Sequence, residues 1–185
     1  HLRTRRQRQM CIRDSLIDGR EEKPWRTSDF VDIFQCYLSG VRYHDGEIMW
    51  NGVTLARDEI APTNITTWRM RVVDNGVVLT AKGKRVGAMA EEFEWDIPIE
   101  LFNSLPTSDL PSIKKRRYHW NGADGLLWEV DEFEDSLAGL IIAEVELDSV
   151  DQSVDFPSWL GMELTNLRGW SNASLSMMIK DSGPD

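Results

Sequence analysis

The chain has 185 residues, with 21 Lys and Arg against 31 Asp and Glu, which gives a formal net charge of −10. This length suffices for one domain with a sizeable core, and no apolar run approaches the roughly 18 residues that a membrane-spanning helix needs. The acidic balance argues against broad affinity for nucleic acids, whose phosphates it repels.

The first fifteen residues differ from the rest of the chain in charge. Five arginines and one aspartate give residues 1–15 a charge of +4, so the other residues carry −14. No apolar run follows that would make a secretory signal, and a basic arm that neutralises phosphates is one interpretation. Residues 5–15, RRQRQMCIRDS, also resemble the translation of a transposase-type sequencing adaptor. We therefore treat residues 1–15 as foreign and residues 16–185 as one domain.

Cysteine usage indicates the compartment. Outside residues 1–15 the sequence has one cysteine, Cys36, which cannot form an internal disulfide. Such a chain is typical of a reducing, cytoplasmic setting.

Short strand-like runs dominate the chain after residue 67. Residues 39–67 hold many turn formers and predict a loop or hairpin insertion. WRMRVV and VVLTAKGK flank Asp74-Asn75-Gly76, which predicts a hairpin, and EEFEWDI predicts a strand that ends at Pro98. IELFNSL then predicts a short helix closed by Pro106.

The second half of the sequence continues this pattern. SIKKRRYHW and LLWEVDEF flank turn formers at 121–125, and LAGLIIAEVELD predicts another strand. FPSWLGMEL is compact and turn-like. SNASLSMMIK predicts a helix capped by Ser171 or Asn172, with apolar residues at helical spacing.

Charges of one sign recur at alternate positions of several predicted strands, which places them on one face. A solvent-exposed face of an ordinary antiparallel sheet would explain any one of these strands. Strands that carry only cations and others that carry only anions make more sense if the faces converge on a closed, water-filled interior. The pairs are Arg69 with Arg71, Glu92 with Glu94, Lys115 with Arg117, Glu129 with Asp131, and Glu144 with Glu146.

Seven motifs in chain order resemble the CYTH superfamily, the triphosphate tunnel metalloenzymes. They are WRMRV, LTAKG, EEFEWDIP, IKKRRY, WEVDEF, GLIIAEVEL and PSWLGMELT. QCYLS at 35–39 matches the Q-G-Y-L segment of the family, with Cys36 in place of glycine. The resemblance implies a mainly β, α+β fold, in which eight antiparallel strands close into a barrel or tunnel with a few peripheral helices.

The resemblance also implies roles for individual residues. Inward cations would bind phosphate, inward carboxylates would hold Mg²⁺ or Mn²⁺, and further groups would lie near the reacting phosphate or orient the attacking water. The phosphate ligands would be Arg69, Arg71, Lys82, Lys115 and Arg117; the metal ligands Asp131, Glu144 and Glu146; and the catalytic groups Tyr37, Glu92 and Glu94.

The opening E-x-E-x-K strand of the family has no counterpart in the sequence. Counting back from Gln35 places it on residues 8–15, inside the adaptor-like segment. We therefore expect the natural first strand to be missing or replaced, with the loss of two metal-binding carboxylates and a lysine.

The resulting hypothesis is a divalent-metal-dependent triphosphatase that hydrolyses inorganic triphosphate or a small triphosphate compound, inactive as written if that strand is absent. A non-catalytic module that binds polyphosphate is an alternative from another class. A class IV-like adenylate cyclase is a third. KKRR at 114–117 is also compatible with a nucleic-acid contact, although the net charge leaves only triphosphate ends as nucleic-acid partners, and no membrane partner is expected.

Overall fold

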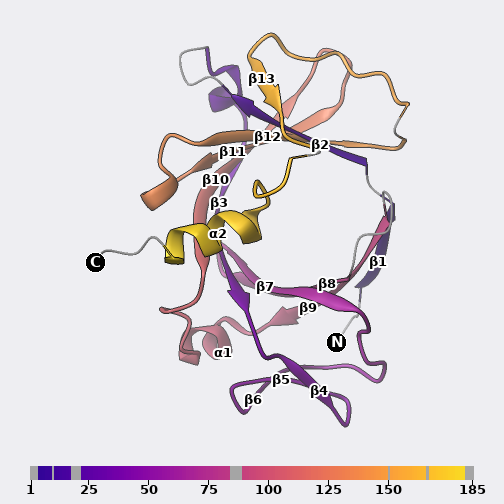
Figure 1. Ribbon diagram of the computed structural model, residues 1–185, viewed down its shortest axis with the longest axis vertical. Helices are drawn as coiled ribbons and strands as arrows, with labels where there is room; N and C mark the ends of the chain where they lie inside the picture. The colour runs from indigo at the N-terminus through magenta and orange to yellow at the C-terminus, as the bar shows by residue number, and fades with distance from the viewer. Residues whose placement is uncertain are drawn as a thin grey trace. The chain divides into compact units, whose positions relative to one another are not determined.

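The computed structural model describes residues 4–9, 11–17, 22–83, 89–149, 151–165 and 167–181 (Figure 1). Its elements group into two compact units. The first unit comprises His1–Gln9, Phe34–Ser112 and Ser176–Asp185, and the second comprises Met10–Ile33 and Ile113–Leu175.

The first unit is built on an antiparallel sheet. Its strands follow the order β1 (Thr4–Gln9), β9 (Met89–Ile97), β8 (Gly76–Gly83), β7 (Ile65–Val73) and the second half of β3 (Phe30–Leu38). Strands β7 and β8 form the predicted hairpin, and Asp74 in its turn has a φ of 51°, a left-handed conformation that aspartate tolerates.

The predicted insertion at 39–67 forms a separate small sheet of β4 (Arg42–His44), β5 (Glu47–Trp50) and β6 (Val53–Arg57). Two dipeptides, Asp45-Gly46 and Asn51-Gly52, connect these strands, and all four residues have positive φ. Two consecutive left-handed residues make the type I′ turn, whose twist matches that of the flanking strands. The hairpin interpretation of this segment is therefore confirmed.

The apolar face of the first unit explains its folding. Met70, Leu79 and Ala81 are fully buried, and Phe93 and Trp95 pack with them. These residues alternate along their strands with charged and polar ones, so the face that the sequence predicts as charged lies opposite the core. Helix α1 (Ile99–Ser104) follows β9 directly, and Leu105 N donates to Phe102 O at its end, which confirms the predicted short helix.

The second unit contains the strand order β3, β10 (Ser112–Asn121), β11 (Leu127–Phe133), β12 (Ile141–Leu147), β2 (Cys11–Ile17) and β13 (Leu160–Glu163). Short 3₁₀ turns span Pro24–Thr27 and Asp135–Leu137. Helix α2 (Asn172–Asp181), of which residues 172–175 belong to this unit, has the predicted cap, because Ser171 Oγ accepts a hydrogen bond from Ser174 N at 3.1 Å. The stretch predicted as turn-like contains the short strand β13.

Aromatic residues form the main core of the second unit. Trp25 and Trp128 are fully buried, and Trp159 packs against both, with ring centroids 4.8 and 6.0 Å away. Val130 and Val145 complete the apolar side of β11 and β12. None of the described helices combines the length and the apolar character that crossing a bilayer requires.

The predicted fold class is confirmed in outline and wrong in one respect. The fold is mainly β, antiparallel, with two α-helices. The described residues form a ten-stranded sheet and a three-stranded one, and the closed eight-stranded barrel is not found among them. The sequence of residues 4–17 supplies two strands, β1 paired with β9 and β2 paired with β12 and β13, where one opening strand was expected.

Candidate functional site

A row of polar side chains crosses three strands of the first unit. The register places Arg69 on β7 opposite Thr80 on β8, and Thr80 opposite Glu94 on β9. Arg69 Nη2 donates to Thr80 Oγ1 at 3.2 Å, and Thr80 Oγ1 donates to Glu94 Oε1 at 3.4 Å. The hydroxyl of Thr80 therefore separates a cation from a carboxylate.

A second row lies two residues along the same strands. Lys82 is paired with Thr67 on one side and Glu92 on the other. Its Nζ lies 2.6 Å from Glu92 Oε1, and 42% of the lysine side chain is exposed. The lysine, unlike Glu92, is substantially exposed, so it can contact a ligand from solvent without a rearrangement of the strands.

Arg69 has a hydrogen-bonding group that no described residue pairs with. Its Nε is buried and lacks a hydrogen-bond partner in the described part of the chain. A buried donor without an acceptor costs free energy, and a guanidinium matches the paired oxygens of a phosphate. The face of the sheet around Arg69 is therefore suited to an anion.

Tyr37 belongs to the same neighbourhood. Burial raises the pKa of its hydroxyl to about 12, although the charges of Arg69 and Arg71 act to lower it. Gln35 Nε2 donates to Tyr37 Oη at 2.8 Å. The tyrosine is thus protonated near neutral pH and its O–H can donate to another acceptor.

The second unit contains a buried ion cluster. Arg117 donates to Asp131 through two parallel bonds, Nε to Oδ1 at 2.6 Å and Nη2 to Oδ2 at 2.8 Å. Lys115 Nζ also donates to Asp131 Oδ2. All three residues are at most 8% exposed. Burial alone would raise the pKa of Asp131, yet the two cations hold it at about 2, and burial lowers that of Lys115 to about 8.

Two glutamates extend this cluster. Arg117 Nη1 donates to Glu129, and Arg117 Nη2 lies 3.8 Å from Glu144 Oε2. The register aligns Glu129, Glu144 and Asp14 across β11, β12 and β2. Burial, together with the charges of Asp14, Asp131 and Glu129, raises the pKa of Glu144 to about 7 in spite of Arg117.

The carboxylates suit Mg²⁺ or Mn²⁺ in their chemistry, because hard divalent cations prefer oxygen ligands. Burial is the main cause of the raised pKa of Glu144, and a divalent cation beside the carboxylate would favour its ionised form. Asp131, in contrast, is occupied by Lys115 and Arg117. Among the residues searched, no group of three or more His, Cys, Asp or Glu is arranged to hold a metal ion.

The predicted site residues thus fall into two groups. Tyr37, Arg69, Glu94 and the pair of Lys82 with Glu92 belong to the first unit, and the ion cluster belongs to the second. Glu146 is exposed and lies one position beyond the core residue Val145, outside the hydrogen bonds described above. The KKRR cluster divides by parity as the alternation predicts, since Lys115 and Arg117 are buried while Lys114 is exposed and Arg116 is partly exposed.

Sequence reasoning did not assign four residues of these groups. Thr80 and Gln35 are neutral, and only their places in LTAKG and QCYLS could have suggested them. Glu129 shares a strand face with Asp131, and this alternation is the signal that could have assigned it a role beside Asp131. Asp14 lies in the adaptor-like segment, where no signal pointed to it.

Known proteins of one family resemble this chain. The CYTH domain matches residues 63–176. An inorganic triphosphatase of Acetivibrio thermocellus is 32% identical over 146 residues, which is 78% of this chain and 85% of that protein. An inorganic triphosphatase of Nitrosomonas europaea is 30% identical over 141 residues, which is 74% of this chain and 91% of that protein.

Solved structures show the same fold. The crystal structure of the inorganic triphosphatase NE1496 superposes with a TM-score of 0.61 at 24% identity, covering 91% of this chain and 94% of that one. The extent of the matched domain and the identity to the Acetivibrio protein both support one conclusion. The chain belongs to the CYTH family.

Proposed function

We propose that the protein is a divalent-metal-dependent triphosphatase that hydrolyses inorganic triphosphate or a small triphosphate compound. The observation that carries this proposal is the face of the first unit around Arg69, whose buried Nε has no acceptor among the described residues. The names of the two relatives, both inorganic triphosphatases, support the choice of substrate.

The first unit supplies phosphate ligands in this proposal. Arg69 and Arg71 each offer a planar guanidinium with several N–H donors. Lys82 offers a compact ammonium, which leaves Glu92 and contacts a phosphate oxygen instead. Tyr37 donates its O–H, because Gln35 already donates to its oxygen. These groups neutralise the charge that develops on the phosphoryl oxygens as the bond breaks.

Glu94 and Glu92 orient the attacking water. Thr80 donates to Glu94 and accepts from Arg69, so the threonine keeps the carboxylate from pairing directly with the arginine. Among the described residues, Thr80 is the donor recorded at Glu94, and a carboxylate with one neutral hydrogen bond retains lone pairs for water. Thr80 is therefore a positioning residue in our proposal.

The second unit supplies the acidic groups. We propose that Asp131, Glu144 and Glu146 hold Mg²⁺ or Mn²⁺, with Glu144 as the principal ligand because Asp131 is already bound by Lys115 and Arg117. Such an ion, when bound, neutralises phosphoryl oxygens and acidifies water. Lys115 and Arg117 keep Asp131 ionised and stay proposed phosphate ligands.

A second candidate is a module that binds polyphosphate without hydrolysing it. The engagement of Asp131 by both Lys115 and Arg117 favours it, because this carboxylate would have to release cations before it could hold a metal ion. In either case we propose a cytoplasmic protein whose partner is a short polyphosphate, with nucleic acids limited to triphosphate ends.

Phosphate release from tripolyphosphate with Mg²⁺ or Mn²⁺ tests the proposal. Arg69→Ala should lower kcat/KM by about 10- to 100-fold, which corresponds to one charge-assisted hydrogen bond. Arg42→Ala removes an exposed arginine of the same unit and should leave the rate unchanged. Absence of release together with tight binding of tripolyphosphate would favour the binding module, and absence of both would reject the two candidates.

A further inference from the structure

Asparagine followed by glycine occurs at three places in the sequence, Asn51-Gly52, Asn75-Gly76 and Asn121-Gly122. Asparagine is a chemically labile residue, because the backbone nitrogen of the next residue can attack its side-chain amide. Glycine permits this attack best, since it has no side chain to obstruct the approach and its backbone is the most adaptable. The three dipeptides are identical, so large differences between their reactivities in the native protein must come from the fold.

The fold blocks the attack at Asn121-Gly122. Gly122 N donates a hydrogen bond to Leu126 O at 2.8 Å, so this nitrogen is already engaged. The space beside Gly122 is also filled, because a Cβ placed on it would lie 2.8 Å from Asp124 Oδ1 and 3.2 Å from Trp128 Nε1. Cyclisation at this dipeptide therefore requires that the turn between β10 and β11 open first.

The β7–β8 hairpin protects Asn75-Gly76 in another way. Gly76 is the first residue of β8, and its register partner is Val73, the last residue of β7. In a turn of this length the N–H of the second flanking residue faces the carbonyl of the first. Attack by Gly76 N therefore requires that the end of the hairpin separate, and the two strands, of 9 and 8 residues, resist that.

Neither kind of protection is found at Asn51-Gly52. Both residues lie inside the turn between β5 and β6, with φ of 48° and 79°, and Trp50 and Val53 are the flanking pair. In the described part of the chain Gly52 N makes no hydrogen bond, both residues are exposed, and a Cβ placed on Gly52 would meet nothing within 4 Å. The strands that hold this turn have only 4 and 5 residues. The glycine nitrogen is therefore available, and the turn has room to rotate.

We propose that Asn51 deamidates spontaneously, faster than any other Asn-Gly asparagine of the native protein, and that its isoaspartate product loosens the β5–β6 hairpin. Gly52 N attacks Asn51 Cγ, the N–Cγ bond forms and the Cγ–Nδ2 bond breaks, and the amide leaves as ammonia with the proton of the glycine nitrogen. Water then opens the succinimide ring at one of its two carbonyl carbons, which gives aspartate or isoaspartate. Neither residue belongs to the phosphate or metal site, so the proposal does not depend on triphosphatase activity.

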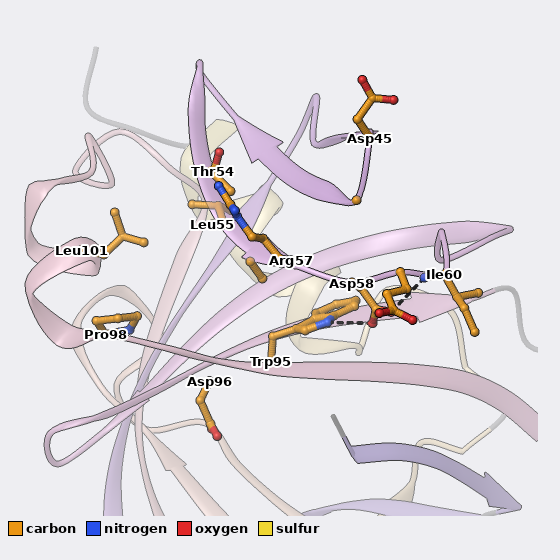
Figure 2. A pocket seen from close by; sticks show the side chains of 13 residues that line it. Asp45, Thr54, Leu55, Arg57, Asp58, Ile60, Trp95, Asp96, Pro98 and Leu101 are labelled. Carbon is orange, nitrogen blue, oxygen red and sulfur yellow. Dashed lines mark hydrogen bonds between the residues drawn. The ribbon is translucent and has the colours of Figure 1, made fainter. Parts of the chain in front are cut away.

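The hairpin that contains Asn51 forms one wall of a pocket. Thr54, Leu55 and Arg57 of β6 line this pocket of about 780 Å³ (Figure 2). Isoaspartate lengthens the backbone of the turn by a methylene, whereas a type I′ turn joins its strands through two residues of defined geometry. The pairing of Trp50 with Val53 is then disturbed at the start of β6, and the wall of the pocket becomes less ordered.

Peptide mapping by mass spectrometry during incubation at pH 8 tests the relative rates. In the native protein Asn51 should convert at least about tenfold faster than Asn75 and Asn121, because neither a hydrogen bond nor a long ladder has to open. In urea the three rates should lie within about threefold of each other, since the fold no longer distinguishes the dipeptides. Equal native rates, a faster native reaction at Asn75 or Asn121, or the native order persisting unchanged in urea would overturn the proposal.

A matched variant separates the longer backbone from the new charge. Asn51→Asp carries the charge of the products on an ordinary backbone, and aspartate tolerates the left-handed conformation of this position. Hydrogen exchange of the peptide that spans β5 and β6 should be faster in the isoaspartate fraction of aged protein than in fresh protein, and unchanged in fresh Asn51→Asp. Equal exchange in the isoaspartate fraction and the fresh protein would overturn the predicted loosening of the hairpin.

Discussion

The two units use the same sequence pattern, cations at alternate strand positions, to different ends. In the first unit Arg69 donates to a neutral hydroxyl, its Nε has no acceptor in the described part of the chain, and Lys82 is partly open to solvent. In the second unit Lys115 and Arg117 are buried and bound to carboxylates. The partners cause the difference, because a cation beside threonine can bind a ligand directly, whereas a cation bound to aspartate must first release that carboxylate.

Substitutions in the two units should therefore affect different properties, ligand binding in the first unit and folding free energy in the second. Removing a partly satisfied cation from the first unit should cost ligand binding and little folding free energy. Removing one member of the buried cluster should leave an uncompensated charge inside the protein, which is among the most costly of single changes. Variants in each unit can therefore test the two roles independently.

The largest effect is expected for Asp131→Ala. It leaves Lys115 and Arg117 buried without their shared partner and should lower the free energy of unfolding by about 3–5 kcal/mol, measured by urea denaturation. Asp32→Asn is the control, because its ion pair with Arg116 is exposed and should be worth less than about 1 kcal/mol. Similar losses of unfolding free energy in both variants would show that the buried cluster contributes no more to stability than the exposed ion pair does.

Thr80→Val should lower kcat/KM for tripolyphosphate by about tenfold while Thr80→Ser restores it. Valine keeps the shape of threonine but lacks the hydroxyl between Arg69 and Glu94, so the arginine can turn to the carboxylate. We expect the loss mainly in KM, since a phosphate ligand is misplaced. A loss that serine does not restore would point to packing instead.

Glu132→Gln should have a smaller, pH-dependent effect. Burial raises the pKa of Glu132, but hydrogen bonds from Arg26 and Trp25 outweigh it and lower the pKa below the ordinary 4.5. The ionised carboxylate therefore stabilises the fold above pH 4.5, and this contribution is lost as the pH falls through the folded pKa. We expect the variant to lose about 1 kcal/mol at pH 7 and less below pH 4. A difference that grows on acidification would contradict this sign.

The smallest effect concerns Cys36, whose thiol should not react with an alkylating reagent in the folded protein. Burial raises the pKa of its thiol to about 12, so almost no thiolate exists at pH 8. Iodoacetamide should leave the Cys36 peptide unmodified in the native protein and alkylate it in urea, as mass spectrometry would show. Rapid alkylation in the native state would place this residue closer to the surface than described.

The sequence predicts the faces of the strands well and their closure poorly. Alternation alone placed Arg69 and Arg71 opposite the buried Met70, because side-chain direction is local. Closure of a sheet depends on which distant edges pair, and no local pattern encodes that. Thr80 was missed for another reason, since a neutral side chain gives no charge signal and acquires its role only when the register sets it between Arg69 and Glu94.

Calorimetric titration with tripolyphosphate in EDTA tests most directly whether the first unit binds phosphate through its own cations. The account predicts binding without metal ions, weakened at least about tenfold by Arg69→Ala and changed by less than about twofold by Arg42→Ala. Equal affinities for the wild type and Arg69→Ala would contradict it.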